Sequence, residues 1–505
     1  MGFLCEKHVG ASGVQGAEGG LVECRSPHDA PGRELVHDHH PPSPAFEEIL
    51  IPLRPGPCST KTLFQRTWWK TDTGSGSSER WFSPASEEKA EDVRVKGCVF
   101  MFQTVDLFAG AGGLALGVSL AGFSTLAVLE WNRWACDTLR ENQRRGFPAL
   151  SGALVHEGDV REFDWSAIPE GVDLITGGPP CQPFSMGGKH RAHGDARDMF
   201  PATVDIIRRV KPKVFLIENV KGLMRSSFAN YFQYILLQLE FPEVSLRPEE
   251  SWADHLSRLQ NEKTSGNPRF SGLTYNVVTT LVNAADYGVP QRRERVFMVG
   301  FRSDLGVEWA FPRATHSQDA MLRSQWIDGE YWERHKGVPR YDLDSFPALA
   351  QRVKRLRGTI DYGDFLPWRT VRDAFARMPE PRREGSPLFF DHILQPGAKA
   401  YLGHTGSALD MPAKTLKAGD HGVPGGENMF QQDDGTFRYF SVRESARLQT
   451  FPDTYVFHGS WTETMRQLGN AVPVSLARKV ASSISGRLAE NALSRLAKAE
   501  RRNAV

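Results

Sequence analysis

Cys181 is the residue of this chain best placed to act as a nucleophile. It lies in the segment 178–185, where Pro179, Pro180 and Pro183 fix the backbone φ angle and remove N–H donors, so that the turn loses little entropy on ordering. The preceding residues 171–177 form a short apolar run bounded by glycines, which is typical of a buried parallel strand. Ligands and chemistry collect beyond the carboxyl ends of such strands. On this segment alone, a buried structural cysteine is an equal alternative.

Composition bounds the classes of protein to be considered. The chain has 505 residues, of which 40% are hydrophobic and 24% charged, and this is typical of a soluble globular protein with about three domain-sized units. The formal net charge is +1, so a nucleic-acid partner must bind a local basic surface. None of the six cysteines forms a C-x-x-C pair, which disfavours a metal site or disulfide framework and fits a reducing cytosol. We expect no bound metal, no membrane segment and no signal peptide.

Residues 1–100 differ from the rest of the chain. They are rich in Gly, Pro, Ser, His and charged residues without a sustained period, so we predict a largely disordered leader. His37, His39 and His40 lack the Cys or acidic partners of a metal site, which favours a solvated tail. We expect regular structure to begin at Met101 and interpret this residue as the natural start. On this interpretation the leader is an upstream reading frame or an accessory tail.

From residue 101 to about 300, strand-like runs alternate with helical ones. This order predicts a doubly wound α/β fold with a mostly parallel sheet covered by helices. The expected strands are 104–108, 125–130, 172–176, 214–218 and 275–282, and the expected helices are 112–121, 134–142, 202–210 and 231–239.

A candidate adenosine pocket follows the first two strands. Residues 106–114 form a glycine-rich turn between a strand and a helix, where a cofactor can approach the backbone closely. Glu130 could accept from two ribose hydroxyls, Trp131 could stack on a purine, and Asp159 could accept from an exocyclic amine. The loop lacks the full G-x-G-x-x-G spacing because position 115 is Ala, and this disfavours a dinucleotide.

Five motifs in this chain resemble those of the bacterial DNA (cytosine-5) methyltransferase family and occur in the family's order. The resemblance spans about residues 102–485, and several ordered motifs are far more specific than one. Val474 departs from the pattern, since many members carry a second proline there. The motifs are residues 106–114, 178–185, 218–220, 291–295 and 466–473.

The resemblance implies a fold, a cofactor and a substrate. The expected fold is that of S-adenosylmethionine-dependent methyltransferases, with S-adenosyl-L-methionine as cofactor and a cytosine flipped out of double-stranded DNA as substrate. Cys181 would attack carbon-6 of the base, Glu218 would donate a proton to the ring nitrogen from a carboxyl of raised pKa, and Arg295 would hold the carbonyl oxygen. Arg293 would support the site or a phosphate. Residues 291, 293 and 295 alternate, which predicts that they project from one face of an extended segment.

The resemblance also assigns binding residues. The expected cofactor contacts are Phe108, Gly110, Gly112, Gly113, Leu114, Glu130, Trp131, Asp159, Pro180 and Asn470. The expected DNA contacts are Gln182, Ser185, Gln291 and Thr415.

The alternating pattern dissolves between residues 303 and 435, where tryptophans and arginines are scattered. This region resembles the family's smaller, irregular target-recognition domain, and its motif at 410–416 is expected to support that domain. For residues 315–365 a loop-rich structural insertion is the alternative. Residues 101–302 and 436–490 would form the catalytic domain, with a last helix that begins near Ser475 and packs beside the first strand. Residues 491–505 would form a terminal helix or tail.

Other functions remain open at this point. A transfer-RNA cytosine methyltransferase shares the catalytic set, but that branch carries a Cys-Phe-Thr element, and this chain has no cysteine after Cys181. A non-catalytic DNA-binding relative would not need Cys181, Glu218 and Arg295 together. A nicotinamide oxidoreductase would leave the thiol unexplained. For a DNA methyltransferase we expect a cytoplasmic, nucleoid-associated monomer, which is either solitary or accompanied by a cognate restriction endonuclease that acts separately.

Overall fold

The computed structural model describes residues 93–95, 98–180, 198–264, 272–337, 343–358, 363–400, 405–418 and 428–503. All of them belong to the second of two compact units, Arg80–Val505. The predicted disorder of residues 1–92 lies outside the described ranges, as do Cys181, Gln182 and Ser185. No helix of the described residues is both long and apolar enough to cross a membrane.

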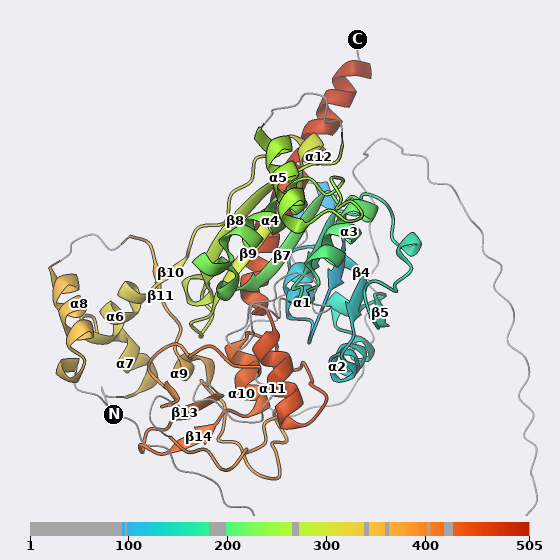
Figure 1. Ribbon diagram of the computed structural model, residues 1–505. Coiled ribbons are helices and arrows are strands. Elements are labelled where there is room, and N and C mark those ends of the chain that lie inside the picture. Colours follow the sequence, from blue (N-terminus) through green and yellow to red (C-terminus); the bar gives the residue numbers. More distant parts are fainter. Residues whose placement is uncertain are drawn as a thin grey trace, which may run out of the picture. The chain divides into compact units, whose positions relative to one another are not determined.

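A seven-stranded sheet is the largest sheet of the described residues (Figure 1). Its order is β5-β4-β3-β6-β7-β9-β8, in which β9 runs antiparallel to both of its neighbours and the strands from β5 to β7 are parallel. This confirms the predicted α/β fold with a mostly parallel sheet. The strands are β3 (Phe102–Leu107), β4 (Phe123–Glu130), β5 (Leu154–Glu157), β6 (Leu174–Gly177), β7 (Val214–Val220), β8 (Tyr275–Asn283) and β9 (Glu294–Arg302).

Helices cover the sheet, and the expected strands and helices lie within about three residues of their predicted bounds. The last helix packs beside α1 and shares a core cluster with Phe102 of β3, as predicted. The contact is close because Gly117 of α1 has no side chain, and a Cβ there would overlap Ala477. The helices are α1 (Gly113–Leu120), α2 (Arg133–Arg144), α3 (Phe200–Val210), α4 (Ala229–Glu240), α5 (Trp252–Thr264), α10 (Val442–Leu448), α11 (Trp461–Asn470) and α12 (Val474–Asn503).

Regular structure begins before Met101, so that prediction is wrong. The strands β1 (Val93–Val95) and β2 (Cys98–Phe100) pair in antiparallel register, with Val93 opposite Phe100. Strand β1 lies against α12. Three-residue strands are too short to produce a visible alternation in sequence, which explains the error.

The region between β9 and α10 consists of short elements, as expected for the irregular domain. Residues 315–365 contain three helices around a small core that includes Met321, Leu322 and Val353, so the described part of this stretch is not a plain loop. The elements are β10 (His316–Ser317), α6 (Gln318–Trp326), α7 (Glu330–His335), α8 (Pro347–Arg357), β11 (Leu366–Pro367), α9 (Val371–Ala374), β12 (Ser407–Ala408), β13 (Met429–Gln431) and β14 (Phe437–Tyr439).

Candidate active site

Glu218 and Arg295 form a buried ion pair at the carboxyl end of β7. Strand β9 runs antiparallel to β7 with Val220 opposite Arg295, and this register brings the arginine beside the acid. Arg295 Nε lies 2.8 Å from Glu218 Oε1, and the two side chains are 12% and 8% exposed. Burial raises the pKa of the Glu218 carboxyl, while Arg295 and Arg293 oppose the shift, and the net direction is upward. The pair therefore provides a carboxyl group whose pKa is shifted in the direction that a proton donor requires.

The loop that leads to Cys181 runs directly beside this pair. Gly177, the last residue of β6, pairs with Ile217 of β7, and the chain then continues past Glu218. A Cβ on Gly178 would lie 3.2 Å from Glu218 Oε2, so a glycine leaves room for the carboxyl group. Pro180 is half-buried, and its carbonyl accepts a hydrogen bond from Met199 N at 3.3 Å. Chain connectivity therefore starts the Cys181 segment next to Glu218.

Glu130 organises the glycine-rich loop at the other end of the site. This last residue of β4 accepts hydrogen bonds from the backbone N–H groups of Gly110 at 2.8 Å, Trp131 at 3.0 Å and Asn132 at 2.8 Å. Gly110 has a φ of +54°, and a Cβ there would meet no atom within 4 Å. The Trp131 ring is exposed. Open space over the loop, an available indole and a fixed carboxylate fit an adenosine-bearing cofactor.

Comparison with known proteins agrees with this geometry. The model of a protein family described as "C-5 cytosine-specific DNA methylase" matches residues 102–243 and 257–486. The chain belongs to this family. Its activity is therefore that of a DNA (cytosine-5-)-methyltransferase, and its fold is that of the S-adenosylmethionine-dependent methyltransferases.

Similar proteins include bacterial type II methyltransferases. The chain is 30% identical to M.NgoFVII of Neisseria gonorrhoeae over 388 residues, which cover 75% of this chain and 85% of the relative. It is 30% identical to M.PspPI of Psychrobacter sp. (strain TA137) over 389 residues, which cover 76% and 79%. A solved structure of a putative DNA modification methyltransferase encoded within a prophage of E. coli has 22% identity and a TM-score of 0.43, covering 77% of this chain and 99% of that chain.

Gln291 and Arg293, two expected site residues of this methyltransferase, lie in the interior of the protein. Gln291 and Arg293 do share one face of the segment before β9, but both are fully buried and cannot reach DNA in this conformation. Gln291 Oε1 accepts from Leu416 N at 3.0 Å, and Arg293 Nη2 donates to Gly469 O at 2.7 Å. Gln291 therefore has no exposed surface for its expected DNA contact, whereas the buried Arg293 fits the supporting role that was one of its two expected roles.

Thr415 takes part in the same set of contacts, between residues 413–416 and residues 291–293, which we call the seam. Its hydroxyl donates to Arg292 O at 2.7 Å, and Ala413 forms a parallel bridge with Gln291. Thr415 is partly exposed, so unlike Gln291 it retains a surface that DNA could contact. The seam fixes residues 413–416 to the segment that leads into β9.

The remaining cofactor residues differ in how open they are. A Cβ on Gly112 would lie 2.9 Å from Leu139 Cδ2, and one on Gly113 would overlap Val472 O, so these glycines permit close packing in the family fold. Arg161 binds the Asp159 carboxylate, with Nε 2.9 Å from Oδ1, and holds the pKa of Asp159 below its usual value. An adenine amine would have to share this carboxylate with Arg161. Phe108 has a φ of +55° and is half-buried, Leu114 is buried, and Asn470 is exposed at the end of α11.

Sequence reasoning missed two polar side chains beside the site. Asn219, which follows Glu218, donates from Nδ2 to Pro179 O, and its place next to the acid was the available signal. Asp106 at the end of β3 is 1% exposed and accepts from Thr176 Oγ1 at 2.6 Å. Burial raises the pKa of Asp106 to about 7. The only sequence signal for Asp106 was its place at the start of the glycine-rich turn.

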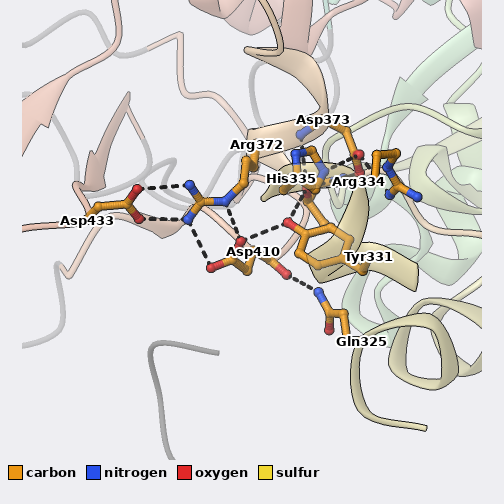
Figure 2. Close-up of polar contacts among 9 residues, drawn as sticks. Gln325, Tyr331, Arg334, His335, Arg372, Asp373, Asp410 and Asp433 are labelled. Atoms are coloured by element: carbon orange, nitrogen blue, oxygen red, sulfur yellow. Dashed lines mark hydrogen bonds and ion pairs between the residues drawn. The ribbon is translucent and has the colours of Figure 1, made fainter. Parts of the chain in front are cut away.

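A polar network holds the 410–416 motif among the short elements between β9 and α10 (Figure 2). Asp410 Oδ1 accepts from Arg372 Nε at 2.6 Å and from the Tyr331 hydroxyl at 2.8 Å, while Gln325 Nε2 donates to Asp410 O at 2.6 Å. Arg372 also pairs with Asp433 at 2.7 Å. The motif thus joins this network at one end and the buried seam with β9 at the other, which agrees with its expected supporting role.

Proposed function

We propose that this methyltransferase transfers a methyl group from S-adenosylmethionine to carbon-5 of a cytosine that is flipped out of a short, specific sequence in duplex DNA. The observation that carries the proposal is the Glu218–Arg295 pair, buried beside the loop that continues into Cys181. A thiol, a proton-holding carboxyl and a guanidinium at one edge of a sheet are the groups that activation of a cytosine ring needs.

In the proposed reaction the Cys181 thiolate adds to carbon-6 of the base and forms an S–C6 bond. Protonated Glu218 donates to the ring nitrogen at position 3, so the negative charge that the addition creates is neutralised and carbon-5 becomes enamine-like. The guanidinium of Arg295 has five N–H donors, so it can hold Glu218 with Nε and offer another donor to the base carbonyl oxygen. Carbon-5 would then bond to the methyl group, whose bond to the sulfonium sulfur breaks and leaves the electron pair on that sulfur. A base takes the carbon-5 proton, the S–C6 bond breaks to release the thiolate, and the ring nitrogen returns its proton to Glu218.

The cofactor would be held at the opposite end of the site. S-adenosylmethionine supplies an electrophilic methyl group on a sulfonium. The Glu130 carboxylate would accept from the ribose hydroxyls, since its backbone bonds leave lone pairs free, and Trp131 would stack on the adenine. The open face at Gly110 would admit the part of the cofactor that lies against the backbone. Asp159 and Asn470 would complete the pocket.

Double-stranded DNA would bind between the catalytic domain and residues 303–435, which would read the sequence. Thr415, Gln182 and Ser185 are the proposed contacts to DNA near the flipped base. The methyltransferase would act as a monomer, either alone or with a cognate restriction endonuclease as a separate protein.

Bisulfite sequencing tests the proposal. Plasmid DNA from cells that express the wild-type chain should contain protected cytosines within one short motif, and DNA from cells that express Cys181→Ser should contain none. Total RNA from the same cells serves as the control for the transfer-RNA alternative. Protected cytosines in the Cys181→Ser sample, or in RNA alone, would overturn the proposal.

A further inference from the structure

We infer that Arg161 sets the selectivity of the cofactor site for the purine ring, because it competes with the exocyclic amine of adenine for the carboxylate of Asp159. The inference rests on the proposed function, in which Asp159 belongs to the cofactor pocket. Arg161 Nε lies 2.9 Å from Asp159 Oδ1 and 3.1 Å from Oδ2, and Nη2 lies 2.5 Å from Oδ2. The backbone N–H of Arg161 also donates to Oδ1 at 2.8 Å. A carboxylate has about four lone pairs, so these contacts occupy most of its accepting capacity.

The backbone holds this pair close to Glu130. Strand β5 pairs with β4 with Glu157 opposite Glu130, and Gly158 N donates to Glu130 O at 3.0 Å. Asp159 follows directly, so it lies at the same end of the sheet as the carboxylate proposed to hold the ribose. The turn that carries the pair is closed by a hydrogen bond from Trp165 Nε1 to Val160 O at 3.0 Å. Arg161 therefore lies beside the proposed cofactor site.

The two side chains suit different purines. Adenine carries an amine at position 6, which donates to a carboxylate, whereas hypoxanthine carries an oxygen there, which accepts from a guanidinium. An unopposed Asp159 would bind the first ring and repel the second. The guanidinium of Arg161 has five N–H donors and directs only those on Nε and Nη2 at Asp159, so it keeps donors for a 6-oxo group. The pair therefore reduces the preference for adenine that the carboxylate alone would give.

Arg161 has space to leave Asp159 when adenine binds. It lines a cavity of about 350 Å³ between residues 160–165 and α3. Asp198 and Asp205 line the same cavity, so a guanidinium that turns into it stays near negative charge. The side chains of Arg161 and Asp159 are 54% and 24% exposed, so water and salt screen their attraction. Adenine can thus displace Arg161 at a small cost, and the competition should lower cofactor affinity by no more than about fivefold.

Binding of two ligands that cannot donate a methyl group tests the inference without turnover. S-adenosylhomocysteine carries adenine, and S-inosylhomocysteine carries hypoxanthine on the same ribose and amino-acid chain. Isothermal calorimetry on the full chain gives the dissociation constant of each. Arg161→Met keeps an unbranched side chain and removes the donors, so it should bind S-adenosylhomocysteine up to about fivefold more tightly and S-inosylhomocysteine about tenfold more weakly. The ratio of the inosyl to the adenosyl constant should therefore rise by at least about tenfold.

Asp159→Asn should move the same ratio in the opposite direction. The amide is a weaker acceptor for the adenine amine, and it leaves the Arg161 guanidinium free to donate to the 6-oxo group. Affinity for S-adenosylhomocysteine should fall, and affinity for S-inosylhomocysteine should rise. A purely structural role of the pair would change both dissociation constants together and leave their ratio as in wild type.

Arg140 and Glu157 provide a matched control, since they form a similar ion pair just before Asp159. Arg140 Nη1 lies 2.6 Å from Glu157 Oε2, and the side chains are 38% and 35% exposed. Arg140→Met should leave both dissociation constants within about twofold of wild type. A ratio that is unchanged or lower in folded Arg161→Met, as judged by its melting temperature, would overturn the inference, as would an unchanged ratio in Asp159→Asn. If wild type bound neither ligand, the proposed function would fail and not merely the role of Arg161.

Discussion

Glu130 and Glu218 are buried carboxyl groups at the ends of two parallel strands, but the protein holds them in opposite ways. Glu130 accepts hydrogen bonds from three backbone N–H groups, one from Gly110 in the glycine-rich turn and two from Trp131 and Asn132 directly after β4. Glu218 has the charge of Arg295 at 2.8 Å, but Oε1 meets no well-directed hydrogen-bond donor among the described residues. A carboxyl group held by three backbone donors keeps its position and suits binding, and burial raises its pKa as it raises that of Glu218. A carboxyl held by one ion pair can change its proton and its partner, which suits chemistry.

Glu218→Gln should produce the largest effect. It tests whether Glu218 is the one of these two residues that takes part in the chemistry. An amide cannot carry a proton to the base, so we expect kcat for methyl transfer to fall by on the order of 10²- to 10⁴-fold. The dissociation constant for S-adenosylmethionine should change little. Glu130→Gln is the matched substitution, and it should weaken cofactor binding in calorimetry much more than it lowers kcat at saturating cofactor. Equal losses of kcat in the two variants would remove the distinction.

Arg295→Ala should shift the pH dependence of the reaction. The guanidinium lowers the pKa of Glu218 against the effect of burial, so its removal raises that pKa further. An acid must be protonated to act, and activity falls as pH rises through its pKa. The alkaline limb of single-turnover rate against pH should therefore move to higher pH, by about 1 to 3 units.

Arg292, an exposed neighbour of Arg293, supplies the control for this shift. Arg292→Ala removes a positive charge from the same segment without touching Glu218, so the position of the alkaline limb should stay as in wild type. A limb that moves to lower pH in Arg295→Ala would contradict the assignment of Glu218 as the acid.

Gly110→Ala and Gly113→Ala should separate cofactor binding from packing in and after the glycine-rich turn that Glu130 holds. A methyl group at Gly110 occupies open space, so the fold should tolerate it, at a cost of about 1–2 kcal/mol for the positive φ. Affinity for S-adenosylmethionine should fall about tenfold, equivalent to about 1.4 kcal/mol.

A methyl group at Gly113 overlaps Val472 O, so this variant should lose about 1–3 kcal/mol of stability through overpacking. Thermal unfolding measures the stability of the two variants, and calorimetry measures their affinity for S-adenosylmethionine. Equal losses of affinity in the two variants would contradict the expected difference between Gly110 and Gly113.

The sequence was sufficient to predict the sheet and the ends of its strands, since the βαβ order and apolar runs carry that information locally. It also placed Glu218 and Glu130 at the carboxyl ends of parallel strands, which share an edge. Arg295 came from the family resemblance, and it reaches this edge at the start of β9, which runs antiparallel to β7. It could not predict that Gln291 and Arg293 are fully buried. Their partners, Leu416 and Gly469, lie more than a hundred residues away, and a polar pair on alternating positions gives the same pattern for a surface and for a buried seam.

Asp159 illustrates a second limit of the sequence. A carboxylate after the third strand predicts a cofactor contact, but only the structure reveals that Arg161, two residues later, already binds it. The strands β1 and β2 illustrate a third, since segments of three residues have no period to detect. In each case the missing information is a contact and not a propensity.

Asp106 lies in the glycine-rich turn that Glu130 holds but, unlike Glu130, it has a buried oxygen without a hydrogen-bond partner among the described residues. Asp106→Asn should have the smallest effect on catalysis. Thr176 binds Oδ1 at 2.6 Å, but Oδ2 has no hydrogen-bond partner among the described residues, and burial raises the pKa from 3.8 to about 7. Between these values the folded protein keeps the proton while the unfolded chain has lost it. Stability should therefore decrease as pH rises from about 4 to about 7, by up to about 1.4 kcal/mol per unit.

Asparagine at position 106 has no proton to exchange and still accepts from Thr176, so this contribution to the pH dependence should vanish. The measurement is urea unfolding of both proteins at several pH values, read as the difference in the free energy of unfolding. Asp106→Asn should gain stability relative to wild type as pH rises to 7, and the difference should then level off. A difference that is constant across this range would mean that Asp106 is ionised in the folded protein at every pH tested. In that case a second buried carboxylate would lie beside Glu130, and an unidentified donor would have to bind Oδ2.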